Sequence, residues 1–250
     1  VVLIIIYRNT GSQKLSFSFA IGKQLFARSR YYIVSGMMVT VFSQTDKIMI
    51  KTMIDDSANG YYSAAITCAA MTGFVFSALI DSMRPVLFES NKISDERFEK
   101  NMARLYSLII YMGLAQSVVL TLLADPIISV LYGKDYLPSI PLLQIITWYS
   151  AFSYMGSVRN IWMLAKEKQR YLWMINLMGA ALNVAGNFAL IPALGASGAA
   201  IASVATQFFT NFILCLIFKP IKPTTRLIVR ALNPKTIIEM IPRKENKNVK

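Results

Sequence analysis

Charged side chains interrupt an apolar segment at residues 31–54, where ionisable groups are costly if the segment lies in a bilayer. The segment contains Asp46, Lys47 and Lys51 within a run otherwise rich in Ile, Val and Met. One such group at the centre of a bilayer costs roughly 2.5–3.5 kcal/mol on insertion scales. Three of them in one segment are typical of a polar pathway through a membrane protein and not of a passive anchor.

Helical spacing places four polar residues of this segment on one face. Thr40, Gln44, Lys47 and Lys51 follow one another at helical steps, whereas Asp46 lies about 100° away around the helix. Two lysines one turn apart repel each other, and an anion between them would relieve the repulsion. The face predicts a site for a phosphate or pyrophosphate headgroup. The alternative is that Lys51 reaches the outer interface while Asp46 and Lys47 pair with neighbouring helices.

A second candidate cation, Arg159, lies near the inner end of the apolar segment 140–164. A guanidinium that faced a cavity would be a good phosphate ligand, and its depth also permits snorkelling to the cytoplasmic interface. Amide side chains in the two following segments either join helices or line a wet cavity. They are Asn176, Asn183, Asn187, Gln207 and Asn211.

The elements that must position these residues are long apolar segments. The chain has 250 residues, of which 55% are hydrophobic and 16% charged, against about 25% charged in soluble domains. Each segment is long enough to cross a bilayer as a helix, and no strand alternation is present. We therefore expect an all-α, polytopic bundle of six transmembrane helices, at 31–54, 61–83, 104–124, 140–164, 171–191 and 195–218.

Basic residues alternate between the gaps that separate these segments. The chain has 26 lysine and arginine residues against 13 acidic residues. Most of the basic residues lie in every other gap along the chain and in the two flanking segments, and the gaps in between contain Lys134 alone. The positive-inside rule then places gaps 84–104 and 165–170 and the C-terminus in the cytoplasm. The same distribution explains the basic charge by membrane topology, so that nucleic acid is not expected as a partner.

Three regions follow along the chain. Residues 1–30 are interpreted as the end of a truncated helix, Val1–Tyr7, and a cytoplasmic loop. Residues 31–218 form the bundle and 219–250 a basic cytoplasmic tail. Pro85 is expected at a span end. Two segments, Pro85–Arg104 and Thr224–Ile241, are amphipathic; they are either ordinary connector helices or helices that lie on anionic lipid headgroups.

Several kinds of chemistry have no residues to carry them. The chain contains no histidine, and its two cysteines, Cys68 and Cys215, each lie inside an apolar segment as small buried hydrophobes do. No nucleophile–base set and no glycine-rich phosphate loop is present. We expect a transporter and not an enzyme, with no cofactor and no metal.

Six short motifs, in order, resemble those of one family. They are DKIMI at 46–50, NGYYSAA at 59–65, ADPII at 124–128, LYGKDY at 131–136, AKEK at 165–168 and IPALGASGAA at 191–200. The chain resembles bacterial O-antigen flippases over about residues 20 to 220. These are polysaccharide transporters of the multidrug/oligosaccharidyl-lipid/polysaccharide exporter superfamily.

The resemblance implies two six-helix bundles around a central cavity, of which this chain is similar to the second. It implies transfer of undecaprenyl-pyrophosphate-linked oligosaccharide, an O-antigen or capsule repeat unit, across the bacterial plasma membrane by alternating access, with coupling to protons or sodium. Lys47 and Arg159 would contact pyrophosphate, and Asp46 would tune the cavity or take part in coupling. The implied partners are the lipid bilayer, the lipid-linked oligosaccharide, an N-terminal bundle, and a polysaccharide polymerase and glycosyltransferases.

Three other functions remain open at this point. A multidrug exporter of the same superfamily usually takes cationic substrates, which the Lys47 and Lys51 face disfavours. A membrane glycosyltransferase or polymerase would need a large loop with acidic catalytic residues, whereas the outer gaps here are short. A structural scaffold would not explain three charged residues in one span.

Overall fold

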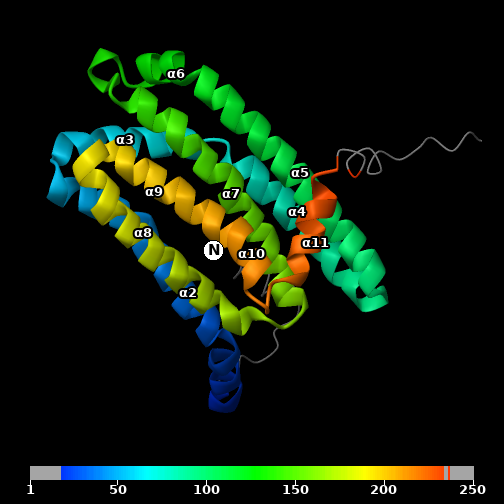
Figure 1. Cartoon of the computed structure of the whole chain (residues 1–250). Helices are drawn as coiled ribbons and strands as arrows, with labels where there is room; N and C mark the ends of the chain where they lie inside the picture. Colours follow the sequence, from blue (N-terminus) through cyan, green and yellow to red (C-terminus); the bar gives the residue numbers. More distant parts are fainter. Residues whose placement is uncertain (1–17, 234–235, 237–250) are drawn as a thin grey trace, which may run out of the picture.

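The computed structural model describes residues 18–233 and residue 236, and every regular element among them is helical (Figure 1). The longer helices are α2 (Phe19–Met53), α3 (Asp56–Ala70), α4 (Gly73–Ile93), α5 (Asp95–Leu122), α7 (Ser139–Ala165), α8 (Leu172–Leu194) and α9 (Ala196–Phe208). The shorter ones are α6 (Ala124–Leu131), η1 (Lys134–Tyr136), η2 (Gln169–Tyr171), η3 (Phe209–Ile213), α10 (Leu214–Ile217) and α11 (Pro223–Ala231). The predicted all-α class is confirmed for this part of the chain.

The helix boundaries follow local sequence. The Asp55 carboxylate accepts a backbone N–H of α3, and the Ser94 hydroxyl does the same for α5, which satisfies donors that a helix start leaves free. Gly195 forms the turn between α8 and α9 and has a φ of 61°, a conformation that favours glycine. At Gly198 a Cβ would lie 2.3 Å from the carbonyl oxygen of Leu190. The α8–α9 hairpin is therefore tight because both positions lack a side chain.

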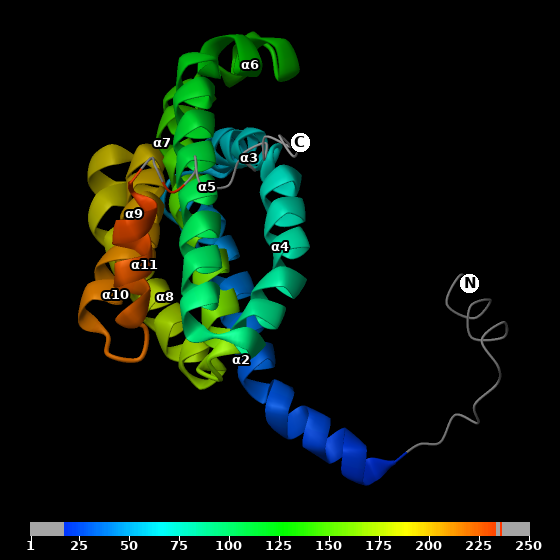
Figure 2. The same cartoon turned by 90° about the vertical axis from the view of Figure 1, so that its right-hand side faces the viewer.

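Helix α7 runs through the middle of the bundle and contacts α3, α4, α5, α6 and α9. Figure 1 shows it between α5 and α9, with α2 and α8 packed together beyond α9. In Figure 2, α6 lies at one end of the bundle, and the first turns of α2 project from the opposite end. A helix surrounded in this way can carry polar side chains on the faces that its neighbours cover.

Two apolar cores meet along α7. One joins α4, α5, the second half of α7, α10 and α11 around Phe98, Tyr106 and Trp162. The other joins α2, α3, α6, the first half of α7 and α9 around Ile50 and Leu143. Both cores hold the helices whose polar side chains form the site described below.

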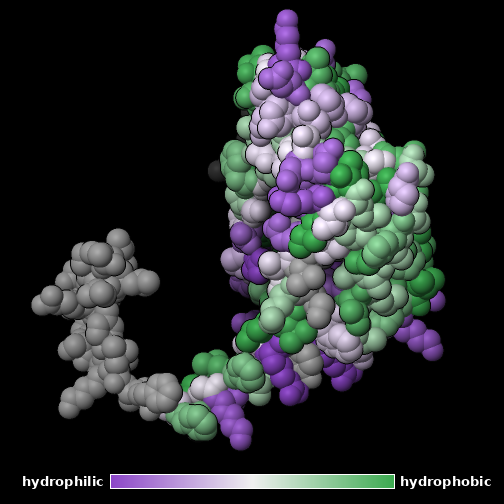
Figure 3. All heavy atoms as spheres, turned by 90° about the vertical axis from the view of Figure 1, so that its left-hand side faces the viewer, coloured by the Kyte–Doolittle hydropathy of each residue, from purple (hydrophilic) through white to green (hydrophobic). Residues whose placement is uncertain are grey.

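Three helical stretches of the described residues are long and apolar enough to cross a membrane: α5, Gln169–Leu194 and Ala196–Ile217. The consecutive helices α3 and α4 pass the same test together, with a bend of 43° between them, which makes up to four spans. Figure 3 shows a broad hydrophobic area beside a band of hydrophilic residues. The membrane class of the protein is supported, whereas the count of six spans is not reached.

The two expected spans that fall short are α2 and α7. Charged residues lower the mean hydropathy of α2, and hydroxyl, amide and guanidinium side chains lower that of α7. Hydropathy counts composition and not the direction of a side chain, so a helix with a polar buried face scores poorly. Their crossing of the membrane stays a prediction.

Four boundaries differ from expectation. Helix α2 begins at Phe19, so residues 19–30, expected in a loop, are helical. The span expected at 61–83 is divided into α3 and α4 by a break at Met71 and Thr72. Pro85 lies inside α4 and not at its end, and a helix tolerates this where neighbours satisfy the backbone group that proline frees. The expected connector helix Pro85–Arg104 is in fact the end of α4 and the start of α5.

The flanking regions are described only in part. Helix α11 covers Pro223–Ala231 of the expected amphipathic segment Thr224–Ile241, and the remainder lies largely outside the described residues. The interpretation of Val1–Tyr7 as the end of an earlier helix also lies outside the described residues.

Candidate functional site

Asp46 of α2 is a buried carboxylate held by three uncharged donors from three other helices. Its side chain is 6% exposed. The Tyr62 hydroxyl of α3 and the Asn187 amide of α8 each donate to it at 2.7 Å, and the Ser203 hydroxyl of α9 donates to it as well. Each donor lies on a different helix, so the carboxylate ties α2 to α3, α8 and α9.

Among the residues that the structure describes, no lysine or arginine forms an ion pair with Asp46. A buried charge is ordinarily paired with an opposite charge or bound to a cation. Here hydrogen bonds from neutral groups replace the counter-ion. Its negative charge therefore has no fixed cationic partner among the described residues.

The hydrogen bonds continue from Asp46 along α8. Asn183 donates to the Ser203 hydroxyl at 3.0 Å, and Asn187 contacts Met49 at 3.6 Å. The Asn187 Oδ1 is buried without a hydrogen-bond partner in the described part of the chain. For Asn183 and Asn187 the structure therefore supports the first of the two predicted roles, that of joining helices.

A cavity of about 120 Å³ borders Asp46. Its lining comes from α2, α3, α7 and α9 and consists of Asp46, Tyr62, Ile66, Ala69, Ala70, Ile146, Tyr149, Ser150 and Ser203. The cavity is mostly apolar, so the Asp46 carboxylate is the one charge in its lining. Tyr149 also lines a second, larger cavity, which places the two side by side along α7.

Arg159 of α7 is the buried cation next to that larger cavity, with a side chain that is 4% exposed. Its Nη1 donates to the carbonyl oxygen of Thr210 and to Asn211 Oδ1, both at 2.8 Å, and its Nη2 donates to Asn160 Oδ1 at 3.3 Å. Thr210 and Asn211 lie in η3, a π-helical segment. Such segments alter the backbone hydrogen-bonding ladder and are frequent at functional sites. Here η3 supplies a carbonyl group to the guanidinium.

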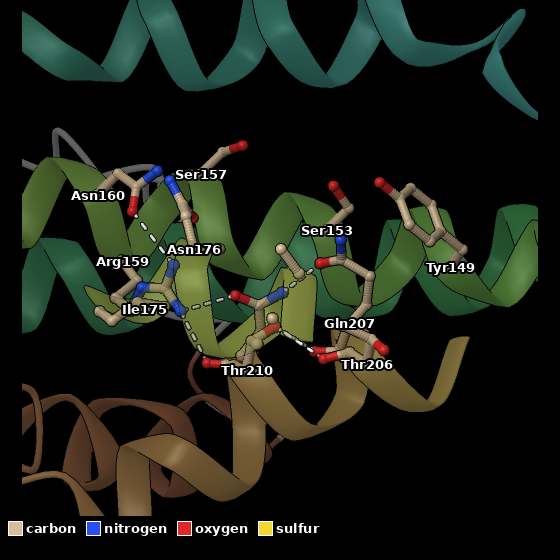
Figure 4. A pocket seen from close by; sticks show the side chains of 14 residues that line it. Tyr149, Ser153, Ser157, Arg159, Asn160, Ile175, Asn176, Thr206, Gln207 and Thr210 are labelled. Carbon is tan, nitrogen blue, oxygen red and sulfur yellow. Dashed lines mark hydrogen bonds between the residues drawn. The ribbon is translucent and has the colours of Figure 1, made fainter. Parts of the chain in front are cut away.

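The larger cavity measures about 190 Å³ and lies between α7, α8 and the α9–η3 segment (Figure 4). Hydroxyl and amide groups dominate its lining: Tyr149, Ser153, Ser157, Asn160, Asn176 and Gln207. Gly156 and Gly179 leave room for the neighbouring helix, and a Cβ at Gly156 would lie 2.5 Å from Asn211 Oδ1. For Asn176, Gln207 and Asn211 the structure supports the second predicted role, that of lining a cavity.

The residues of the predicted cationic face of α2 do not come together at one site. Lys47 is half-buried and has no ion-pair or hydrogen-bond partner within the described residues, and Gln44 is exposed. Lys51 pairs with Asp56 at 2.8 Å at the start of α3, where both side chains are largely exposed. None of the three lines either cavity. Of the five predicted site residues, Asp46 and Arg159 are the two at cavities.

Sequence reasoning missed two direct partners of Asp46, namely Tyr62 and Ser203. Tyr62 lies within the NGYYSAA motif at 59–65, and Ser203 lies in none of the motifs given above. Both are hydrogen-bonding groups inside apolar helices, and this was the available signal. Pairing them with Asp46 requires the tertiary structure, because the three residues lie on three helices.

Two comparisons with known proteins show what the chain is similar to. The model of the family described as "polysaccharide biosynthesis protein" matches residues 1–141. An uncharacterized membrane protein of Methanocaldococcus jannaschii is 26% identical over 221 residues, which is 83% of this chain and 43% of that protein. The chain thus spans less than half the length of this relative. No solved structure matches the chain. Because the family model covers more than half of the sequence, the chain belongs to the polysaccharide biosynthesis protein family.

Proposed function

We propose that the chain is the second bundle of a flippase that moves undecaprenyl-pyrophosphate-linked oligosaccharide across the plasma membrane by alternating access. The observation that carries this proposal is the pair of buried charges, Asp46 and Arg159, each held by uncharged groups next to a cavity inside a membrane bundle. Ionisable groups in such positions mark substrate or ion pathways. The family membership supports polysaccharide assembly as the process that this pathway serves.

Six crossings are part of the proposal. Helix α7 contacts five other helices, and its Arg159, Ser153 and Asn160 lie at a cavity within the bundle. Helix α2 carries Asp46 toward α3, α8 and α9, and its hydrogen bonds offset much of the cost of burying the charge. Both helices therefore suit a membrane interior in spite of their composition.

Within the flippase, Lys47 and Asp46 have separate roles. Lys47 has no ion-pair or hydrogen-bond partner among the described residues, which leaves its ammonium group available to a diphosphate as a point charge. Asp46 takes the coupling cation, a proton or sodium, because its oxygens already lie at a junction of four helices whose packing the cation would alter. Movement of one bundle against the other is what alternating access requires.

The basic C-terminal region is placed in the cytoplasm by the same proposal. Exposed Lys222, Arg226 and Arg230 of the α11 region fit the positive-inside rule. The proposed partners are an N-terminal bundle, a polysaccharide polymerase and glycosyltransferases.

The test uses the full-length protein in a strain that lacks its own copy. We expect unflipped lipid-linked repeat units to accumulate in that strain and wild-type protein to clear them. Lys47→Ala should restore no export although the protein inserts, whereas Lys51→Ala should restore it, because Lys51 is engaged in an exposed ion pair. Normal surface polysaccharide in the deletion strain would overturn the proposal, and wild-type export by Lys47→Ala would remove Lys47 from the site.

A further inference from the structure

The chemistry of the Arg159 guanidinium sets the orientation of the two amides that face it, and through one of them that of Gln207. A guanidinium has only donors, so each amide that faces it must present its oxygen. Asn211 and Asn160 do so at 2.8 and 3.3 Å. Asn211 then donates its own NH₂ group to Gln207 Oε1 at 2.7 Å. The consequence is a chain of hydrogen bonds that runs in one direction, from Arg159 through Asn211 to Gln207.

The far end of this chain is the Gln207 NH₂ group, which hydrogen-bonds to the Tyr149 hydroxyl and keeps a second N–H. Because Gln207 Oε1 is occupied, the group that Gln207 presents beyond the chain is its NH₂, and Figure 4 shows Gln207 reaching from α9 toward Ser153 of α7. Asn160 is exposed and likewise turns its oxygen to Arg159 and its NH₂ away. Both amides line the 190 Å³ cavity. The cavity therefore offers oriented amide donors together with the hydroxyl groups of Tyr149 and Ser153.

The guanidinium itself is not offered to a ligand. Nη1 and Nη2 bond to protein oxygens, and Nε is buried with no partner among the described residues. A bidentate contact with a phosphate or carboxylate needs two accessible N–H groups on one edge, whereas Nη2 keeps one N–H and Nε is buried. The lining also contains no second basic side chain. The cavity is thus built for acceptor oxygens of an uncharged group and not for an anion.

We propose that this cavity is a subsite for one uncharged sugar ring, with Gln207 and Asn160 as hydrogen-bond donors to its oxygens. Arg159 acts as a positioning residue that fixes both amides and does not touch the ligand. The volume is below the roughly 300 Å³ at which pockets for drug-sized ligands begin, so that one ring fits and an oligosaccharide does not. The subsite rests on the proposed flippase function. In that function the cavity binds one sugar of the lipid-linked oligosaccharide, and the diphosphate binds at another place.

The experiment measures transfer by the full-length protein in proteoliposomes with three isoprenyl diphosphates. One carries glucose, one N-acetylglucosamine, and one no sugar; the first two distinguish hydroxyl from acetamido oxygens as the acceptor. Gln207→Met should lower transfer of the sugar-bearing lipid that the wild type prefers by roughly fivefold, the value of one lost hydrogen bond. Transfer of the sugar-free lipid should not change. Gln144→Met is the matched control, because Gln144 is an exposed amide of α7 outside the cavity.

Asn211→Asp tests the positioning role. An aspartate still accepts from Arg159 but has no NH₂ for Gln207, so Gln207 is free to turn and discrimination between the two sugars should fall while the protein stays folded. If Asn211 has only a structural role, the variant should still discriminate between the two sugars. That result would overturn the positioning role. An equal fall for all three lipids in Gln207→Met, or no fall, would overturn the subsite.

Failure of the flippase function would give a different result. Wild-type protein would then transfer none of the three lipids, and a second measurement would decide the subsite. Methyl glucoside or methyl N-acetylglucosaminide should raise the unfolding temperature of wild-type protein and of Gln144→Met, but not of Gln207→Met. The absence of any rise with either glycoside would overturn the subsite independently of transport.

Discussion

The hydrogen bonds to Asp46 predict a specific order of stability among substitutions at that position. Asp46→Ala removes the acceptor and leaves donors on Tyr62, Asn187 and Ser203 inside the protein. Each buried donor without a partner costs about 1–3 kcal/mol. Asn187 keeps a 3.4 Å contact with Asn183 Oδ1, and the Tyr62 hydroxyl can turn into the adjoining 120 Å³ cavity. We therefore expect a loss of about 3 kcal/mol, near the lower end of the summed range.

Asp46→Asn should cost less. The remaining oxygen still accepts from Asn187, and the hydroxyl groups of Tyr62 and Ser203 can rotate to accept from the new NH₂, since a hydroxyl both donates and accepts. A loss of about 1 kcal/mol is expected, from weaker bonds to a neutral acceptor. Asp56→Ala is the matched control, because Asp56 is an exposed aspartate whose ion pair with Lys51 is worth about 0–1 kcal/mol.

The assay is reversible unfolding of the full-length protein in mixed micelles with increasing SDS, followed by circular dichroism. The expected order of unfolding free energies is wild type and Asp56→Ala, then Asp46→Asn, then Asp46→Ala. Equal stability of Asp46→Ala and Asp56→Ala would refute the argument, because it would mean that the three donors are not stranded when the carboxylate is removed.

Three further substitutions test the packing of the bundle by the same unfolding assay. Gly198→Ala should lower stability by more than 1 kcal/mol, since its Cβ would lie 2.3 Å from the carbonyl oxygen of Leu190; wild-type stability would contradict the tight hairpin. Glu167→Gly should raise stability by about 1 kcal/mol, because Glu167 is a non-glycine residue with a φ of 53° at the end of α7; a loss would argue against that conformation. Lys51→Ala should change stability by less than 1 kcal/mol, as expected for an exposed ion pair, and a larger loss would show that the pair is shielded from water.

Much of the fold was predictable because a bilayer restricts what a chain can do. A long apolar segment must form a helix in lipid to satisfy its backbone groups, so the segments that contain α5, α8 and α9 could be found from composition alone. The division of 61–83 into α3 and α4 could not, since the break at Met71 and Thr72 contains no proline or charge. Helix α7 could also be expected, at 140–164, although hydroxyl, amide and guanidinium side chains lower its mean hydropathy.

The candidate site was predictable only at the level of residue type. Asp46 and Arg159 stood out because charge is expensive in an apolar segment. Helical spacing correctly separated Asp46 from the face of Lys47 and Lys51, but it could not show that Lys51 would meet Asp56 beyond the end of the helix. Spacing orders side chains around one helix and carries no information about the neighbours of that helix.

The sequence by itself determined the helical class, the membrane environment and a set of charged candidates that includes Asp46 and Arg159, because each follows from the cost of moving a group out of water. The tertiary structure decided what surrounds those charges. Asp46 meets donors from α3, α8 and α9, and Arg159 meets a carbonyl group of the π-helical η3. Those contacts depend on how four separate helices pack, and only the packing sets which oxygen each donor reaches.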